Sequence, residues 1–71
     1  MNISRIYGMH TLCFNPITLK GEIKFIPTHT TSSLVEMDDQ GIITYSNPRS
    51  LPDQTIREFN LTIIEHLGER E

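Results

Sequence analysis

Residues 33–46 of this 71-residue chain read SLVEMDDQGIITYS. Two segments with strand-like composition, 33–37 and 42–46, flank the polar stretch Asp38-Asp39-Gln40-Gly41. Asp is favoured at the first position of a type I turn, and Gly readily takes the left-handed conformation at the last. The stretch therefore predicts an antiparallel β-hairpin, and the rest of the fold is worked out from it.

Upstream of this hairpin, apolar and polar residues alternate and predict a strand over about 17–26. Pro27 ends that strand, because proline cannot donate a hydrogen bond to a sheet. Gly21 has two interpretations: it lies at a bulge inside one strand, or Lys20 and Gly21 form the loop of a tight hairpin. The alternation keeps its phase through Gly21, which favours the bulge. The apolar phase of this strand consists of Ile17, Leu19, Gly21, Ile23 and Phe25.

Residues 9–14 also have strand-like composition, with Leu12 and Phe14 in phase. Asn15-Pro16 then supplies a turn that leads into the next strand, which predicts another hairpin. The expected sheet is therefore small and antiparallel, with two β-hairpins and about four strands. Those strands cover about 9–14, 17–26, 33–37 and 42–46.

The sequence after the sheet has the signals of a helix over about 51–67. Ser50 is placed to cap it, with Asp53 three residues later as in a capping box, and Gly68 supplies a stop. The apolar residues that follow recur at spacings of three and four, so they share one helix stripe about 80° wide. They are Ile56, Phe59, Ile63 and Leu67. We expect a single α+β domain, residues 1–71, in which this C-terminal helix packs on the sheet.

Three residues of the predicted helix do not fit a simple sheet-facing stripe. Asn60 falls inside the apolar stripe, where its amide needs a hydrogen-bond partner, whereas Leu61 and Ile64 broaden the apolar surface at its flank. We therefore assign Asn60, Leu61 and Ile64 to self-association and expect a homodimer. An equally good interpretation of Asn60 is a bond to a carbonyl group at the sheet edge.

The charge balance bears on the kind of partner. Six Lys plus Arg face nine Asp plus Glu, and the formal net charge is -3. Binding to nucleic acid or to a membrane surface needs clustered Lys and Arg, whereas the basic residues here are scattered. We expect neither a nucleic acid nor a membrane to be the main partner.

Cysteine use and hydropathy bear on the compartment. Cys13 is the only cysteine, and a secreted domain of this size is normally held by several disulfides, so a cytoplasmic protein is expected. The apolar runs are far shorter than the roughly 20 residues that span a bilayer, and no signal peptide is evident. The chain looks like a complete small open reading frame of bacterial or phage origin.

No motif indicates a metal, a cofactor or a catalytic centre. His10, Cys13, His29 and His66 are the candidate zinc ligands, but only His10 and Cys13 are closely spaced, and zinc modules usually show two such pairs. The chain has no nucleophile elbow, no phosphate-binding glycine loop and no metalloprotease motif. We therefore expect no enzyme activity.

These observations favour a small protein-interaction module that acts as a regulator, inhibitor or adaptor. The residues expected to bind a protein partner are Glu36, Asp38, Asp39 and Tyr45. Together with the acidic residues near the C-terminus, Glu65, Glu69 and Glu71, they would steer the protein toward a basic surface. The alternative is a small dimeric nucleic-acid-binding regulator that uses Lys20, Lys24 and Arg49, and an enzyme with a site at a subunit boundary is a third hypothesis.

Overall fold

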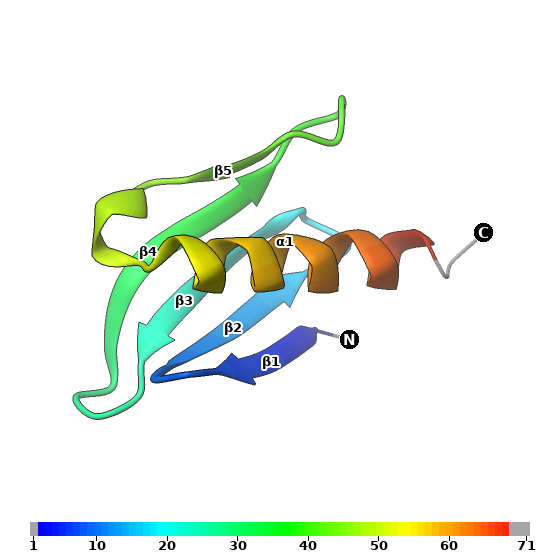
Figure 1. The fold of residues 1–71 in the computed structure, drawn as a ribbon. Coiled ribbons are helices and arrows are strands. Elements are labelled where there is room, and N and C mark those ends of the chain that lie inside the picture. The colour runs from blue at the N-terminus through cyan, green and yellow to red at the C-terminus, as the bar shows by residue number, and fades with distance from the viewer. Residues whose placement is uncertain (1, 69–71) are drawn as a thin grey trace.

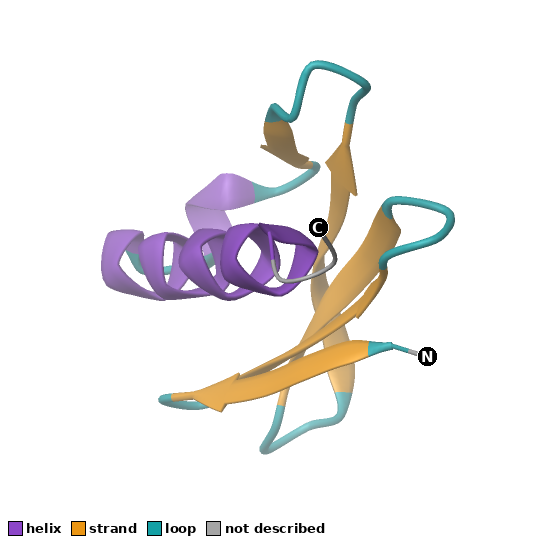
Figure 2. Ribbon diagram, turned by 90° about the vertical axis from the view of Figure 1, so that its right-hand side faces the viewer, coloured by secondary structure: helices purple, strands orange, loops and turns teal. Residues whose placement is uncertain are grey.

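The computed structural model describes residues 2–68 and shows one antiparallel sheet with one helix packed on it (Figure 1). The five strands are joined in sequence order, so every neighbour along the chain is also a neighbour in the sheet. Figure 2 shows the helix on one side of the sheet only. The elements are β1 (Ile3–Tyr7), β2 (His10–Asn15), β3 (Lys20–Phe25), β4 (Thr30–Met37), β5 (Ile43–Tyr45), the short 3-10 helix η1 (Pro48–Ser50) and α1 (Asp53–Gly68).

The predicted α+β class is confirmed, but the sheet has a fifth strand, β1, that the sequence pattern did not reveal. The inward side of β1 carries Ile3, Arg5 and Tyr7, whereas Ile6 faces the opposite side of the sheet. Because the charged Arg5 occupies an inward position, the alternation of apolar and polar residues that marks a strand is not visible in β1. Gly8 has a φ of 60°, as expected for the first residue of a two-residue II′ turn, and this turn joins β1 to β2.

The strand expected over 17–26 begins only at Lys20, because residues 16–19 form the turn from β2 to β3. The side-chain oxygen of Asn15 accepts hydrogen bonds from the backbone N–H of Ile17 at 2.8 Å and of Thr18 at 3.3 Å. The Ile17 side chain is consequently in the loop and 75% exposed. Its place in the apolar alternation did not reflect burial.

Both interpretations of Gly21 are wrong. Gly21 lies inside β3, opposite Phe14, and neither a bulge nor a hairpin loop occurs there. A Cβ atom at this position would lie 2.7 Å from the Cα of Phe14 and collide with the carbonyl oxygen of Cys13. Glycine is therefore needed because the backbones of β2 and β3 approach each other closely. The register shift occurs farther along, between Ile23 and Lys24 in their pairing with β4.

The core lies between α1 and the inward face of the sheet. Phe59 and Ile63 of α1 are fully buried, and Ile56 and Leu67 are partly buried against the same core, as the helical stripe predicts. The sheet and the segment before α1 provide the other buried apolar side chains. These are Ile3, Leu12, Phe14, Ile23, Val35 and Leu51.

The predicted capping box is also wrong, because α1 begins at Asp53 and Ser50 belongs to η1. The Ser50 hydroxyl donates to the carbonyl oxygens of Ser32 and Asn47, both at 2.9 Å. Pro52 provides the carbonyl that accepts the N–H of Ile56 at 3.1 Å. The polar residues before the helix thus bind the sheet instead of capping α1.

The edge of β4 that extends beyond β5 is covered by side-chain hydrogen bonds. The Ser46 hydroxyl accepts the N–H of Leu34 at 2.9 Å, and the Asn47 side-chain amide donates to the Ser32 carbonyl at 3.3 Å. Ser33 contributes its hydroxyl as the acceptor for the Asn47 N–H at 3.0 Å. The chain thereby satisfies an edge that would otherwise present free backbone groups. No helix within residues 2–68 is long and apolar enough to cross a bilayer.

The close approach at Gly21 predicts that Gly21→Ala destabilises the protein. The added methyl group must push β3 away from β2, at a cost of about 2 kcal/mol, which lowers the melting temperature by about 10 °C. Thermal unfolding followed by circular dichroism measures the change. Gly68→Ala is the matched control, since a Cβ at Gly68 meets nothing within 4 Å. Equal melting temperatures for the two variants would contradict this explanation of Gly21.

Candidate protein-interaction surface

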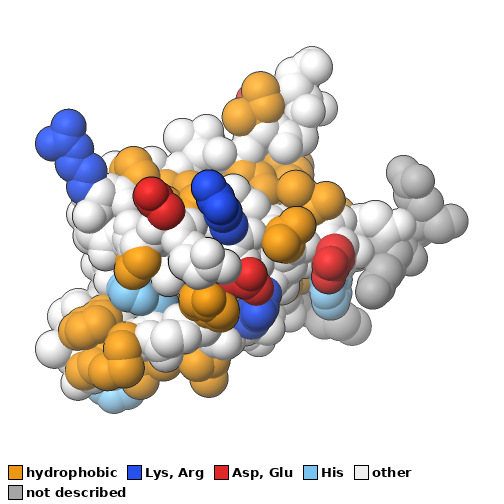
Figure 3. Space-filling view, in the orientation of Figure 1, with side chains coloured by type: hydrophobic (Ala, Val, Ile, Leu, Met, Phe, Trp, Pro, Cys, Tyr) orange, Lys and Arg blue, Asp and Glu red, His pale blue; other side chains and the backbone are white. Residues whose placement is uncertain are grey.

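The side of α1 turned away from the sheet carries two exposed apolar residues. Leu61 is 52% exposed and Ile64 is 53% exposed, although both belong to the same helix that buries Phe59 and Ile63. Arg57 and Glu65 are exposed on the same side. We call Arg57, Leu61, Ile64 and Glu65 the outer stripe of α1. Figure 3 shows basic, hydrophobic and acidic side chains following one another along the helix.

Asn60, which was assigned to self-association together with Leu61 and Ile64, lies on the side of α1 that faces β5, within the stripe where the sequence placed it. Its side-chain oxygen accepts a hydrogen bond from the Tyr45 hydroxyl at 2.6 Å. The polar group in the apolar stripe therefore has a partner within the chain, although that partner is a side chain and no sheet-edge carbonyl. Its assignment to self-association stays a prediction.

Tyr45 points toward α1, where its hydroxyl donates to the Asn60 side chain. Its phenol is half-buried against the helix. Burial raises the pKa of Tyr45 from 10.0 to about 12, because the tyrosinate would lose much of its hydration. Tyr45 was expected to contact a partner together with the acidic hairpin tip. Its hydroxyl is engaged with the helix.

Arg5 holds the opposite side of α1 to β1. Its guanidinium forms an ion pair with the Glu58 carboxylate at 2.9 Å, and it donates to the Thr62 hydroxyl at 2.9 Å and to the Glu58 carbonyl at 3.1 Å. It also lies 5.5 Å from the centre of the Tyr7 ring, a cation–π distance. We call Arg5 and Tyr45 the helix clamp, since each joins one edge strand to α1.

The acidic residues expected to bind a partner do not form a single patch with Tyr45. Asp38 uses its carboxylate in the turn itself, where one oxygen accepts the N–H groups of Gln40 and Ile42, both at 2.9 Å. Asp39 is exposed at the tip, and Ile42 beside it is 60% exposed. Glu36 is on β4, opposite Lys20 of β3. The hairpin tip therefore offers Asp39 and Ile42, whereas Glu36 belongs to the uncovered face of the sheet.

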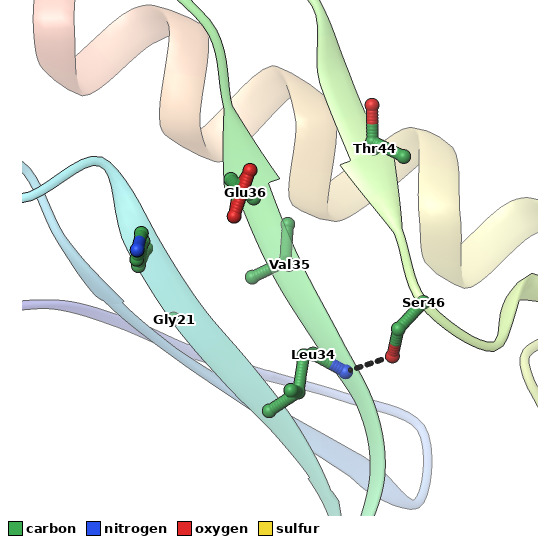
Figure 4. Close-up of a pocket in the computed structure, with 7 residues that line it drawn as sticks. Gly21, Leu34, Val35, Glu36, Thr44 and Ser46 are labelled. Carbon is green, nitrogen blue, oxygen red and sulfur yellow. Dashed lines mark hydrogen bonds between the residues drawn. The ribbon is translucent and has the colours of Figure 1, made fainter.

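A shallow depression lies on that uncovered face, across β3, β4 and β5 (Figure 4). Its lining combines polar and charged residues with Gly21, Val35 and Leu34, of which Leu34 is 56% exposed. The charges around it are balanced, because Lys20 is opposite Glu36 in the sheet. No concentration of one charge marks this depression as a site for an ion. Its lining is Lys20, Gly21, Leu34, Val35, Glu36, Thr44 and Ser46.

The residues of the nucleic-acid alternative are exposed, but carboxylates lie close to both lysines. Lys24 forms an ion pair with Glu22 at 3.5 Å, and Lys20 is opposite Glu36 across the strand pair. Arg49 belongs to η1 and not to the sheet. A phosphate on this face would have to compete with the carboxylates, so the face is a poor match to a nucleic-acid backbone.

The candidate zinc ligands are not brought together. His10 is buried on the helix side of the sheet, with its ring 5.4 Å from that of Phe25, whereas Cys13 is exposed on the opposite side. Among residues 2–68, no group of three or more His, Cys, Asp or Glu side chains is arranged to hold a metal ion. Glu65 is exposed on α1, and the other two residues of the expected acidic tail, Glu69 and Glu71, lie outside the described residues.

Comparison with protein-family models, with curated proteins and with solved structures gives no significant match to this chain. Its function is therefore inferred from its own residues. Two features that matter for the surface were missed in the sequence: Arg5, because β1 was not predicted, and the symmetric placement of Arg57 and Glu65 about Leu61. The available signal for Arg5 was a single charged residue between the apolar residues Ile3 and Ile6.

The raised pKa of Tyr45 predicts a loss of stability at high pH. Between the unfolded pKa of 10.0 and the folded pKa of about 12, the unfolded chain releases the tyrosine proton while the folded chain retains it. The free energy of unfolding therefore falls as pH rises through this window. Tyr45→Phe should remove this contribution, which denaturant unfolding measured across the window would reveal.

The titration can be observed directly in the Tyr7→Phe variant, because Tyr45 is then the only tyrosine. Near-ultraviolet absorbance of tyrosinate should give a midpoint close to pH 12 for the folded protein and close to 10.0 in concentrated urea. The same midpoint in both conditions would show that the phenol is not buried against α1.

Proposed function

We propose that this protein is a small protein-interaction module that acts as a regulator, inhibitor or adaptor and self-associates through the outer stripe of α1. The observation that carries the proposal is the exposure of Leu61 and Ile64, each more than half exposed and three residues apart on one side of the helix. Phe59 and Ile63 already fill the core below. The additional apolar pair is not needed for packing within the chain.

Because the domain is small, association with a partner would add to its folding stability. A folded chain of this length has a stability margin of only a few kcal/mol to about ten, and a partner that binds only the folded state adds to that margin. The interface offered by α1 is small, so a weak and reversible dimer is expected. A module of this kind can exchange its second copy for another protein of similar surface.

The β4–β5 hairpin tip is the second part of the proposal, as the contact to a partner with a basic surface. Asp39 provides an exposed carboxylate, and Ile42 provides an exposed apolar side chain next to it. Complementary charge increases the rate of encounter and selects the partner, and an apolar contact adds affinity. We place this activity in the cytoplasm, where the exposed thiol of Cys13 stays reduced.

The outer stripe predicts that Leu61→Glu weakens self-association. A carboxylate at the centre of the interface must lose its hydration there, so the dimer dissociation constant should rise at least tenfold, which corresponds to about 1.4 kcal/mol. Sedimentation equilibrium over a range of concentrations measures the constant.

Leu34→Glu is the matched control, since Leu34 is exposed to a similar degree, 56%, on the opposite face of the protein. The control should associate like the unmodified chain. An unchanged dissociation constant for Leu61→Glu, or no association of the unmodified chain at all, would overturn the proposal.

The hairpin tip predicts that Asp39→Lys reduces binding of a basic protein partner without lowering the melting temperature. Asp39 is the preferred position for the change, because Asp38 is required for the turn. Capture of partners from a nuclease-treated lysate of the native host would compare the two baits. Gln40→Glu adds negative charge at the same tip and should not reduce recovery. Equal recovery with Asp39→Lys would remove the tip from the binding surface.

A further inference from the structure

We propose that two copies of the chain pair through α1 in antiparallel orientation, about a two-fold axis at Leu61. This inference rests on the proposed self-association. In this arrangement Arg57 of each copy meets Glu65 of the other. The occupant of the exposed helix side is thus a second copy of this chain.

The spacing along α1 supports this orientation. Arg57 precedes Leu61 by four residues and Glu65 follows it by four, so each charge is about 6 Å from Leu61 along the helix axis, in opposite directions. An antiparallel pair centred on Leu61 brings each Arg57 level with the partner's Glu65. A parallel pair would place arginine beside arginine and glutamate beside glutamate.

Both charges are available for this role. Arg57 and Glu65 have no ion-pair partner among the described residues, and they are about 12 Å apart along the axis, too far to pair with each other. Glu58, the acidic residue next to the outer stripe, is held by Arg5 at 2.9 Å. Arg57 and Glu65 are therefore available, one on each side of Leu61.

The surface beside Leu61 is hollow. The hollow is bordered by Arg5, Glu58, Leu61, Thr62, Glu65 and His66. Leu61 is one of these residues and is 52% exposed. About a two-fold axis at this point, Leu61 of each copy can enter the hollow beside Leu61 of the other. One surface then supplies both the projecting side chain and the depression that receives it, as an isologous interface requires.

Charge reversal tests the orientation. Arg57→Glu and Glu65→Arg should each raise the dimer dissociation constant about tenfold, because both symmetric pairs change from attraction to repulsion. The double variant, Arg57→Glu with Glu65→Arg, should recover the affinity of the unmodified chain. Sedimentation equilibrium at low salt measures all four proteins, and circular dichroism confirms that each variant is folded.

A mixture of the two single variants adds a second measurement, because only the antiparallel pairing predicts that each variant alone is weakened while the mixed dimer is not. In an antiparallel heterodimer every 57–65 contact joins opposite charges, so the mixed dimer should form with the affinity of the unmodified chain. Fluorescence anisotropy of one labelled variant titrated with the other measures it. A mixed dimer no tighter than either single variant alone, or a double variant as weak as the single ones, would overturn the proposed orientation.

The outcomes separate this inference from the proposed function. If Leu61→Glu abolishes association while charge reversal has no effect, self-association through α1 stands and the antiparallel pairing is wrong. If Leu61→Glu leaves association unchanged, the proposed function itself fails at this surface.

Discussion

The attachment of α1 to both edges of the sheet determines the remaining surface of this protein. Arg5 of β1 bonds Glu58 and Thr62 on one side of the helix, and Tyr45 of β5 bonds Asn60 on the other. These polar contacts set the rotation of α1 about its axis, which apolar packing alone specifies less strictly. Since the rotation is fixed, the same residues always face outward. The outer stripe is therefore a defined surface, because the orientation of α1 on the sheet is fixed.

Much of the fold was predictable because its signals are local. The turn at Asp38–Gly41 and the helical stripe of Phe59 and Ile63 each depend on neighbouring residues, and both were correctly identified. The role of Gly21 was not predictable, since it depends on the approach of β2, which the period of β3 does not reveal. β1 was missed because Arg5 occupies an inward position of the strand. The carboxylate of Glu58 neutralises Arg5 there, and Glu58 is more than fifty residues away in the sequence.

The candidate surface was predictable in part. The helical wheel already placed Leu61 and Ile64 outside the core stripe, and the structure leaves both exposed. The wheel placed Asn60 inside the core stripe, but it could not show that the Tyr45 hydroxyl of β5 is the hydrogen-bond partner of the Asn60 side chain. Glu36 and Tyr45 were expected to share one binding surface, but they lie on opposite sides of the sheet. Residues that are near each other in a hairpin can face opposite sides. Only the three-dimensional arrangement identified which charges near Leu61 remain unpaired.

The two edges of the sheet differ in a way that limits how far a continuous sheet could extend from one copy to the next. On one side, β5 is three residues long, and the adjoining edge of β4 is bonded by Ser46, Asn47 and Ser50. On the other side, β1 forms the outermost strand over five residues. Growth of a continuous ribbon needs two edges that both accept a strand. Because only the β1 edge leaves a strand-length row of backbone groups unpaired, edge-to-edge pairing could join two copies into one continuous sheet but could not extend that sheet further.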